Sequence, residues 1–198
     1  MTGALVAFEG LDQSGKETQA RRLQARCEAA GRRVEFLAFP CYQTAIAKEI
    51  AAALAGERRY TADVLQLLFV ANRYEYRDRI ERAIAAGDIV ICDRYAASSV
   101  AYGEAFGLDP AGLTDVQRFL PRPTVTVLLD IAAERAADRK RANRDQFERD
   151  LQMLTRVRAS YQRQAAADDR WAVIDGSRDI ETVAQSVSAA IDARLGLR

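Results

Sequence analysis

The chain has 198 residues, of which 49% are hydrophobic and 29% are charged, and its formal net charge is +1. This composition favours a folded domain over a disordered chain, and it lacks the basic excess typical of proteins that coat nucleic acid. The chain contains 26 arginines, three lysines and no histidine. The absence of histidine excludes Ser-His-Asp hydrolysis, the HExxH zinc site and the 2-His-1-carboxylate iron site. Any catalysis must therefore use carboxylates, arginine, lysine, hydroxyl groups, backbone dipoles or a bound metal.

Cysteine usage and hydropathy indicate a reducing compartment. Cys27, Cys41 and Cys92 are far apart and odd in number, which argues against a zinc site, a dithiol or a disulfide framework. No apolar stretch approaches 18 residues, and the apolar run at the N-terminus is too short for a signal peptide. We therefore expect a cytoplasmic protein that binds neither a membrane nor nucleic acid.

Short apolar runs alternate with longer helical patterns along the chain. Gly31 ends the first predicted helix, Pro40 stops the second predicted strand, and Asp109-Pro110 resembles an N-cap followed by proline at N1. Continuous apolar strands separated by helices indicate an α/β fold, a five-stranded parallel sheet covered by helices on both faces. In chain order, the pattern predicts a strand at 4–8, a helix at about 16–30, a strand at 34–39, helices at 44–55 and 61–86, a strand at 89–92, a helix from 110 to about 120, a strand at 125–130, a charged helical segment, a strand at 171–174 and a helix at 180–195.

The segment GLDQSGKET lies between the first predicted strand and the first predicted helix. Its GxxxxGK spacing is typical of a P-loop, in which successive backbone N–H groups point at a phosphate. Lys16 adds a full positive charge, and the following helix adds its N-terminal dipole. The alternative is a glycine-containing turn with an exposed lysine. The P-loop interpretation assigns the donor phosphates to Gly10, Leu11, Asp12, Gln13, Ser14, Gly15, Lys16, Glu17 and Thr18.

Three side chains are candidate ligands for Mg²⁺. A P-loop normally places Ser or Thr directly after the lysine, but here Glu17 occupies that position and Thr18 follows one residue later. Asp93 ends the third predicted strand, where ligands of parallel sheets bind, so it can face Mg²⁺ directly or through water. Its neighbour Arg94 can hold a phosphate through two hydrogen bonds. The alternative for this pair is a surface ion pair that caps the following helix.

Five sequence blocks follow one another along the chain: FEGLDQSGKETQ, an FP pair, LLFVANRYE, DRYAASSVAYG and LPRPTVTVLLD. Together they resemble the thymidylate kinase family, of the P-loop nucleoside monophosphate kinase group, over nearly the whole chain. The resemblance implies a single kinase domain over residues 1–198 with the P-loop kinase fold and a short charged lid at about 134–150. It also implies transfer of the γ-phosphoryl group of ATP to dTMP, with Mg²⁺, giving dTDP and ADP, by a homodimer.

The resemblance further implies the residues that bind dTMP. In the family, the P-loop aspartate contacts the acceptor nucleotide, the arginine of DRY binds its phosphate, and the phenylalanine of LLFxANR stacks on thymine. From the residues alone, Phe69 is better explained as a core residue on an apolar helix face. Cys41 and Tyr42 occupy positions where the family often carries an arginine. The implied dTMP site is Asp12, Phe39, Pro40, Phe69, Arg73, Arg94, Ser98, Ser99 and Tyr102.

Charge is concentrated in the segment ERAADRKRANRDQFER at 134–149. A solvated helix face explains most of these charges. The resemblance implies a lid that closes over ATP, and since Gln13 stands where some members carry a catalytic arginine, the lid supplies that charge here. Arg144 and Arg139 are the leading candidates. The implied catalytic set is Lys16, Asp12, Arg94, Arg144 and Arg139.

Two other functions stay open at this stage. One is a P-loop kinase for another nucleotide, and the other is a non-catalytic or regulatory NTP-binding protein, which Glu17 would fit. The kinase interpretation agrees with the lack of histidine, because a phosphate monoester has a second pKa of about 6 and is mostly a dianion at neutral pH. Such an acceptor needs fixed cations rather than a general base.

Overall fold

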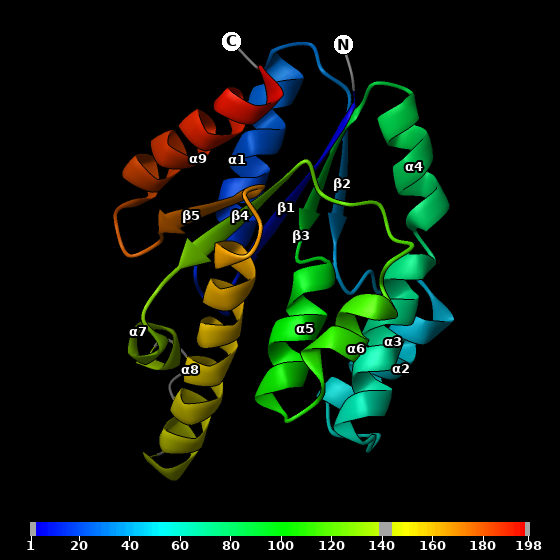
Figure 1. The fold of residues 1–198 in the computed structure, drawn as a ribbon, viewed down its shortest axis with the longest axis vertical. Coiled ribbons are helices and arrows are strands. Elements are labelled where there is room, and N and C mark those ends of the chain that lie inside the picture. The colour runs from blue at the N-terminus through cyan, green and yellow to red at the C-terminus, as the bar shows by residue number, and fades with distance from the viewer. Residues whose placement is uncertain (1–2, 139–143, 197–198) are drawn as a thin grey trace.

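The computed structural model describes residues 3–138 and 144–196, with 137, 138 and 144–150 described by their backbone alone. Five parallel strands form one sheet in the order β2-β3-β1-β4-β5, and helices cover both of its faces (Figure 1). The predicted α/β fold with a five-stranded parallel sheet is therefore confirmed. The strands are β1 (Ala4–Gly10), β2 (Val34–Ala38), β3 (Ile89–Asp93), β4 (Val125–Asp130) and β5 (Trp171–Asp175).

Helices connect successive strands, as parallel pairing requires. Asp109 caps α6, because its carboxylate accepts the backbone N–H groups of Ala111 and Gly112, and Pro110 is the first helical residue. The helices are α1 (Lys16–Ala29), α2 (Ala45–Leu54), α3 (Ala62–Tyr74), α4 (Arg77–Ala85), α5 (Ala96–Ala105), α6 (Pro110–Asp115), α7 (Ala133–Asp138), α8 (Arg144–Ala166) and α9 (Ile180–Leu195).

The central strand β1 carries the core on both of its faces. Side chains alternate along a strand, so Val6 and Phe8 point to one face, where α1 and α9 lie side by side (Figure 1). Leu5 and Ala7 point to the opposite face, which α4 covers. Helices α5 and α8 cover the same opposite face beside β4. Glu9 continues the second set, so a carboxylate enters the layer between the sheet and α5 and α8.

The parallel register brings functional segments to one edge of the sheet. β1 pairs with β3 through Phe8 and Asp93, and with β4 through Gly10 and Leu129. The loop after β1 and the loop after β3 therefore leave the sheet side by side. This edge is where ligands bind in open parallel sheets.

The prediction of one helix over residues 61–86 is wrong. The structure has α3 and α4 there, and the chain turns at Glu75 and Tyr76. The Tyr76 ring packs edge-on against Phe39 with ring centroids 5.8 Å apart, and Asn72 donates a hydrogen bond to Glu75. With this turn, α4 covers β3 while α3 packs against α2 and α5, which one straight helix cannot do.

Two other elements differ from the prediction. The helix that begins at Pro110 ends at Asp115, well before Leu120, and turns follow it. Helix α5 has no counterpart among the predicted elements. Its buried residues are distributed nearly all round it, so it has no amphipathic stripe for a periodicity argument to detect.

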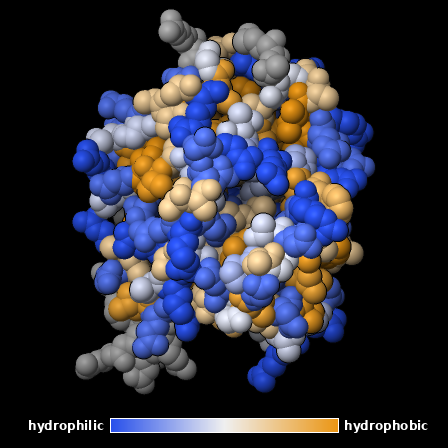
Figure 2. Space-filling model, viewed as in Figure 1, coloured by the Kyte–Doolittle hydropathy of each residue, from blue (hydrophilic) through white to orange (hydrophobic). Residues whose placement is uncertain are grey.

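The surface visible in Figure 2 has hydrophobic side chains in small groups between hydrophilic ones. Within the described residues, no helix combines the length and the apolar character that crossing a bilayer requires.

The core can be tested with a matched pair of valines on neighbouring strands. Val127 in β4 is fully buried, whereas Val173 in β5 is 56% exposed. We expect Val127→Ala to lower the free energy of unfolding by about 2 kcal/mol, because it removes two buried methyl groups and leaves a cavity. Val173→Ala should change it by less than about 0.5 kcal/mol. Urea unfolding of both variants measures the difference, and equal losses would contradict this packing.

Candidate active site

The loop between β1 and α1 has the backbone shape of a P-loop. Gly10, Gln13 and Gly15 have positive φ angles of 144°, 66° and 89°. A Cβ added at Gly10 would lie 2.6 Å from the carbonyl oxygen of Leu129, so no larger residue fits there without a shift of backbone. Helix α1 begins at Lys16, directly after the loop, which directs its N-terminal N–H groups into the curve.

Lys16 is held inside the loop. Its ammonium group donates a hydrogen bond to the carbonyl oxygen of Leu11 at 3.1 Å and lies 3.9 Å from a carboxylate oxygen of Asp12. Burial, followed by the charge of Arg94, lowers the pKa of Lys16 to about 8. The loop thus concentrates backbone donors and one buried cation at the carboxyl edge of the sheet, which is the arrangement that binds phosphates.

Arg94 is the centre of the hydrogen-bond network at this edge. Its Nη2 donates to Asp12 Oδ1 at 2.5 Å and to the hydroxyl of Tyr102 at 3.3 Å. Its Nη1 donates to Ser98 Oγ at 3.1 Å and to the hydroxyl of Tyr161 at 3.3 Å. The backbone of Arg94 has a φ of 63°, in the left-handed region that non-glycine residues rarely adopt. Such strain persists only where the surroundings impose it, and it is common at functional sites.

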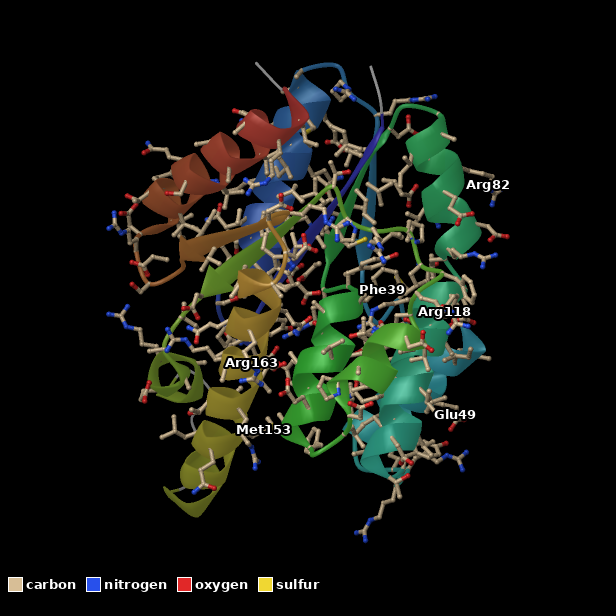
Figure 3. All side chains as sticks on the ribbon, viewed as in Figure 1. Phe39, Glu49, Arg82, Arg118, Met153 and Arg163 are labelled. Carbon is tan, nitrogen blue, oxygen red and sulfur yellow. The ribbon has the colours of Figure 1, made fainter. Side chains whose placement is uncertain are left out.

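A cavity of about 920 Å³ opens beside the P-loop. Phe39 and Met153, both labelled in Figure 3, line it from the end of β2 and from α8. The sequence analysis missed part of this wall, including Gln66, Phe106 and Met153. All nine residues assigned to the dTMP site by resemblance line this cavity: Asp12, Phe39, Pro40, Phe69, Arg73, Arg94, Ser98, Ser99 and Tyr102.

Helix α3 contributes an aromatic ring and a buried guanidinium to the cavity. Phe69 is only partly buried and its side chain lines the cavity wall, so the interpretation as an ordinary core residue does not describe it. Arg73 is 2% exposed and donates from Nη1 to Ser99 Oγ at 2.8 Å and to the carbonyl oxygen of Phe69 at 3.2 Å. Among the described residues, its Nε has no hydrogen-bond partner. A ring and a spare donor suit a planar ligand that carries carbonyl oxygens.

Two buried residues behind the cavity also escaped the sequence analysis. Glu9 and Tyr161 contact each other and both belong to the network around Arg94. Glu9 sits in an apolar strand and Tyr161 in a helix far along the chain, so neither belongs to a pattern that sequence spacing can reveal. The family block FEG contains Glu9, which is the one signal that singles it out.

A second cavity of about 640 Å³ lies between α5, α6, α8 and the sheet. Its walls contain Gln117, Arg118 and Arg170, and they contain none of the P-loop residues Gly10–Thr18. The first cavity has both Asp12 and Arg94 in its wall, so we assign the chemistry to the first.

The residues at the carboxyl edge fit a divalent cation that is also held by phosphates. No group of three acidic, histidine or cysteine side chains in the described parts of the chain could hold a metal alone. Asp93 Oδ1 is buried without a hydrogen-bond partner among these residues, and burial raises the pKa of this carboxyl group. Glu17 and Thr18 lie exposed in the first turn of α1. Mg²⁺ commonly takes one or two carboxylates together with substrate phosphates and water.

The structure does not describe the side chains of the two candidate lid arginines. Arg139 lies outside the described residues, and Arg144 is described by its backbone only, as the first residue of α8. Their predicted catalytic role therefore stays a prediction.

The fold and the site define a P-loop α/β protein with a nucleotide-sized cavity beside its phosphate-binding loop. The chain belongs to the thymidylate kinase family, since the model of that family, described as Thymidylate kinase, matches residues 8–187. This identification agrees with the family resemblance of the sequence blocks.

Individual relatives match over most of their length. The thymidylate kinase of Homo sapiens is 33% identical over 188 residues, which cover 93% of this chain and 88% of that protein. The thymidylate kinase of Xanthomonas oryzae pv. oryzae is 38% identical over 200 residues, covering 99% and 86%. The solved structure of thymidylate kinase from Candida albicans aligns with a TM-score of 0.78 at 25% identity, covering 97% of this chain and 92% of that one.

The pKa of Lys16 predicts how nucleotide binding depends on pH. With a pKa of about 8 in the nucleotide-free protein, Lys16 loses its proton as the pH rises through that value. We expect the affinity for ATP to fall by about tenfold by about pH 9, because only about a tenth of the molecules then carry the charge. Equilibrium titration between about pH 6 and about pH 10 measures the profile. Lys16→Arg keeps its charge and should lack the alkaline fall; a flat profile for the unmodified protein would contradict the prediction.

Proposed function

We propose that this chain transfers the γ-phosphoryl group of ATP to dTMP, giving dTDP and ADP. The observation that carries the proposal is the contact between Arg94 and Asp12, which joins the P-loop to the wall of the cavity at 2.5 Å. A donor phosphate on the loop and an acceptor phosphate at Arg94 would be neighbours. The family membership supplies the identity of the two substrates.

The acceptor half of the reaction depends on fixed cations. Arg94 binds the dTMP phosphate, Phe69 stacks on the thymine ring, and Arg73 donates to a base oxygen through the donor capacity that the protein leaves unused. Tyr102 lies close enough to Arg94 to contact the sugar beside the phosphate. The dianionic phosphate is itself the nucleophile, so no residue has to remove a proton.

The donor half depends on the P-loop. The N–H groups of Gly10–Thr18 and the ammonium group of Lys16 hold the phosphates of ATP, and Asp12 keeps Arg94 oriented toward the acceptor. Positioning two polyanions and neutralising their charge accounts for most of the catalysis of phosphoryl transfer. A lid arginine, Arg144 or Arg139, would cover the transferred group and exclude water.

A divalent cation serves ATP in this family's reaction, and we propose that it is Mg²⁺. When bound, it neutralises charge that develops on the donor phosphate oxygens. The unpartnered Oδ1 of Asp93 is the best-supported protein ligand, directly or through a water molecule. Glu17 and Thr18 are the remaining candidates.

The homodimer and the cytoplasmic location also stay predictions. The free thiols of Cys27, Cys41 and Cys92 support a reducing compartment.

The activity is tested by following ADP formation with ATP, Mg²⁺ and a panel of acceptors that contains dTMP, dUMP, dCMP, AMP, GMP and thymidine. We expect dTMP to have the highest kcat/KM, and Lys16→Ala to lower its turnover by several orders of magnitude. Turnover of another acceptor but not of dTMP would make the chain a kinase for a different nucleotide. No turnover of any acceptor would favour a non-catalytic NTP-binding protein.

Arg94→Ala tests the grip on the acceptor. We expect the KM for dTMP to rise on the order of a hundredfold while the KM for ATP changes much less, because Arg94 lies in the cavity wall and Lys16 and the P-loop amides still hold the donor phosphates. Arg163→Ala is the matched control, since this arginine is paired with Glu104 and lies outside the cavity wall. Steady-state kinetics with each substrate varied in turn measures both constants. A change in the KM for ATP alone would place Arg94 on the donor side.

A further inference from the structure

A fully buried carboxylate lies directly behind Arg94. Glu9 has no exposed surface and does not line the first cavity, so it cannot touch a ligand there; it lies in the wall of the second cavity. Three groups donate hydrogen bonds to it. The backbone N–H of Tyr95 donates to Oε1 at 2.8 Å, and the hydroxyls of Ser98 and Tyr161 donate to Oε2 at 2.7 Å and 3.0 Å.

The same two hydroxyl groups accept hydrogen bonds from Arg94. Its Nη1 donates to Ser98 Oγ at 3.1 Å and to the Tyr161 oxygen at 3.3 Å. A hydroxyl group has one proton and two lone pairs. The oxygens of Ser98 and Tyr161 also lie 2.9 Å from each other, where either could donate. With both protons directed at the carboxylate, both oxygens keep lone pairs that accept the guanidinium.

Glu9 also fixes the backbone on which Arg94 stands. Arg94 has a left-handed φ of 63°, and its own N–H donates to the carbonyl oxygen of Phe8 at 2.9 Å. The next N–H, that of Tyr95, is the one that donates to Glu9. Strand β1 therefore holds the strained residue from both sides.

We infer that Glu9 is a positioning residue for the acceptor phosphate: it orients the hydroxyls of Ser98 and Tyr161 so that they hold Arg94 in its phosphate-binding geometry. The inference rests on the proposed function of Arg94. It assigns Glu9 no contact with substrate. None of its hydrogen bonds goes to Phe69 or Arg73, the residues assigned to the base, or to the P-loop amides, so we expect its effect to fall on the phosphate.

Only a carboxylate satisfies these three donors. Glutamine has the same shape, but one of its two terminal atoms carries N–H groups. If the nitrogen faces the hydroxyls of Ser98 and Tyr161, it donates to the oxygens that Arg94 needs. If it faces the other way, it opposes the N–H of Tyr95. The pKa of Glu9 is raised, because burial outweighs the hydrogen bond from Ser98 and the charges of Arg94 and Arg73, which lower it. The three donated hydrogen bonds stabilise the ionised form against that burial.

The test compares a ligand that has the phosphate with one that lacks it. Binding of dTMP and of thymidine is measured by calorimetry or NMR titration for the unmodified protein and for Glu9→Gln. We expect the affinity for dTMP to fall by about tenfold to about a hundredfold, and the affinity for thymidine to stay the same. If Glu9 only stabilised the fold, the affinities for dTMP and thymidine would fall together.

Glu104→Gln is the matched control. Glu104 in α5 accepts hydrogen bonds from two residues of α8, the Ser160 hydroxyl at 2.5 Å and Arg163. Glu104 does not line the first cavity. This variant undergoes the same chemical change, also next to a serine hydroxyl, and it should bind both ligands like the unmodified protein.

The inference is overturned if folded Glu9→Gln binds dTMP normally, or if it loses dTMP and thymidine in equal measure. If Glu9→Gln does not fold, Tyr161→Phe replaces it. This variant removes one hydroxyl group of the network. It must lower the affinity for dTMP severalfold and leave the affinity for thymidine unchanged; unchanged affinity for dTMP overturns the inference. The proposed function fails separately, if the unmodified protein binds dTMP but does not phosphorylate it. The affinities of the variants then still decide the role of Glu9.

Discussion

The parallel pairing of β1 with β3 and β4 is the constraint on which the site depends. β1 lies in the middle of the sheet, so the loops that follow β1 and β3 leave it at the same edge. This register puts Lys16 and Arg94, which are 78 positions apart in sequence, around one carboxylate, Asp12. An arginine and a lysine so close together would repel each other, and Asp12 lies between their charges. The same edge then receives the α1 dipole, so the groups available for phosphates all converge on one point.

The face of the sheet opposite α1 carries the buried polar groups that support Arg94. β1 alternates its side chains, and the alternation that buries Leu5 and Ala7 also sends Glu9 into the interior. A carboxylate there is costly unless it is fully hydrogen-bonded. Helices α5 and α8 meet this need by placing Ser98 and Tyr161 against it. The result is a continuous chain of polar contacts from the core of the sheet to the cavity wall.

Arginine dominates this site for a physical reason. A guanidinium has a planar fork of donors and stays charged when buried, whereas a buried lysine loses its proton readily. Arg73 is nearly inaccessible and Arg94 shares its donors among four side chains, so both need several directed hydrogen bonds. Lys16, by contrast, occupies the P-loop, where a compact point charge fits within the curve of the backbone.

The sequence by itself determined the strand pattern, the P-loop and, through its blocks, the family and nine residues of the cavity wall. Those features are local, because apolar runs, the GxxxxGK spacing and short motifs each lie within one short contiguous segment of the sequence. Only the tertiary structure decided the break between α3 and α4, the existence of α5 and the partnership of Glu9 with Tyr161. Tyr76 turns the chain because its ring packs on Phe39, and α5 is buried nearly all round, so neither leaves a period in the sequence. Glu9 and Tyr161 are separated by 152 positions, and only the packing of α8 on β1 gives the buried carboxylate its partner.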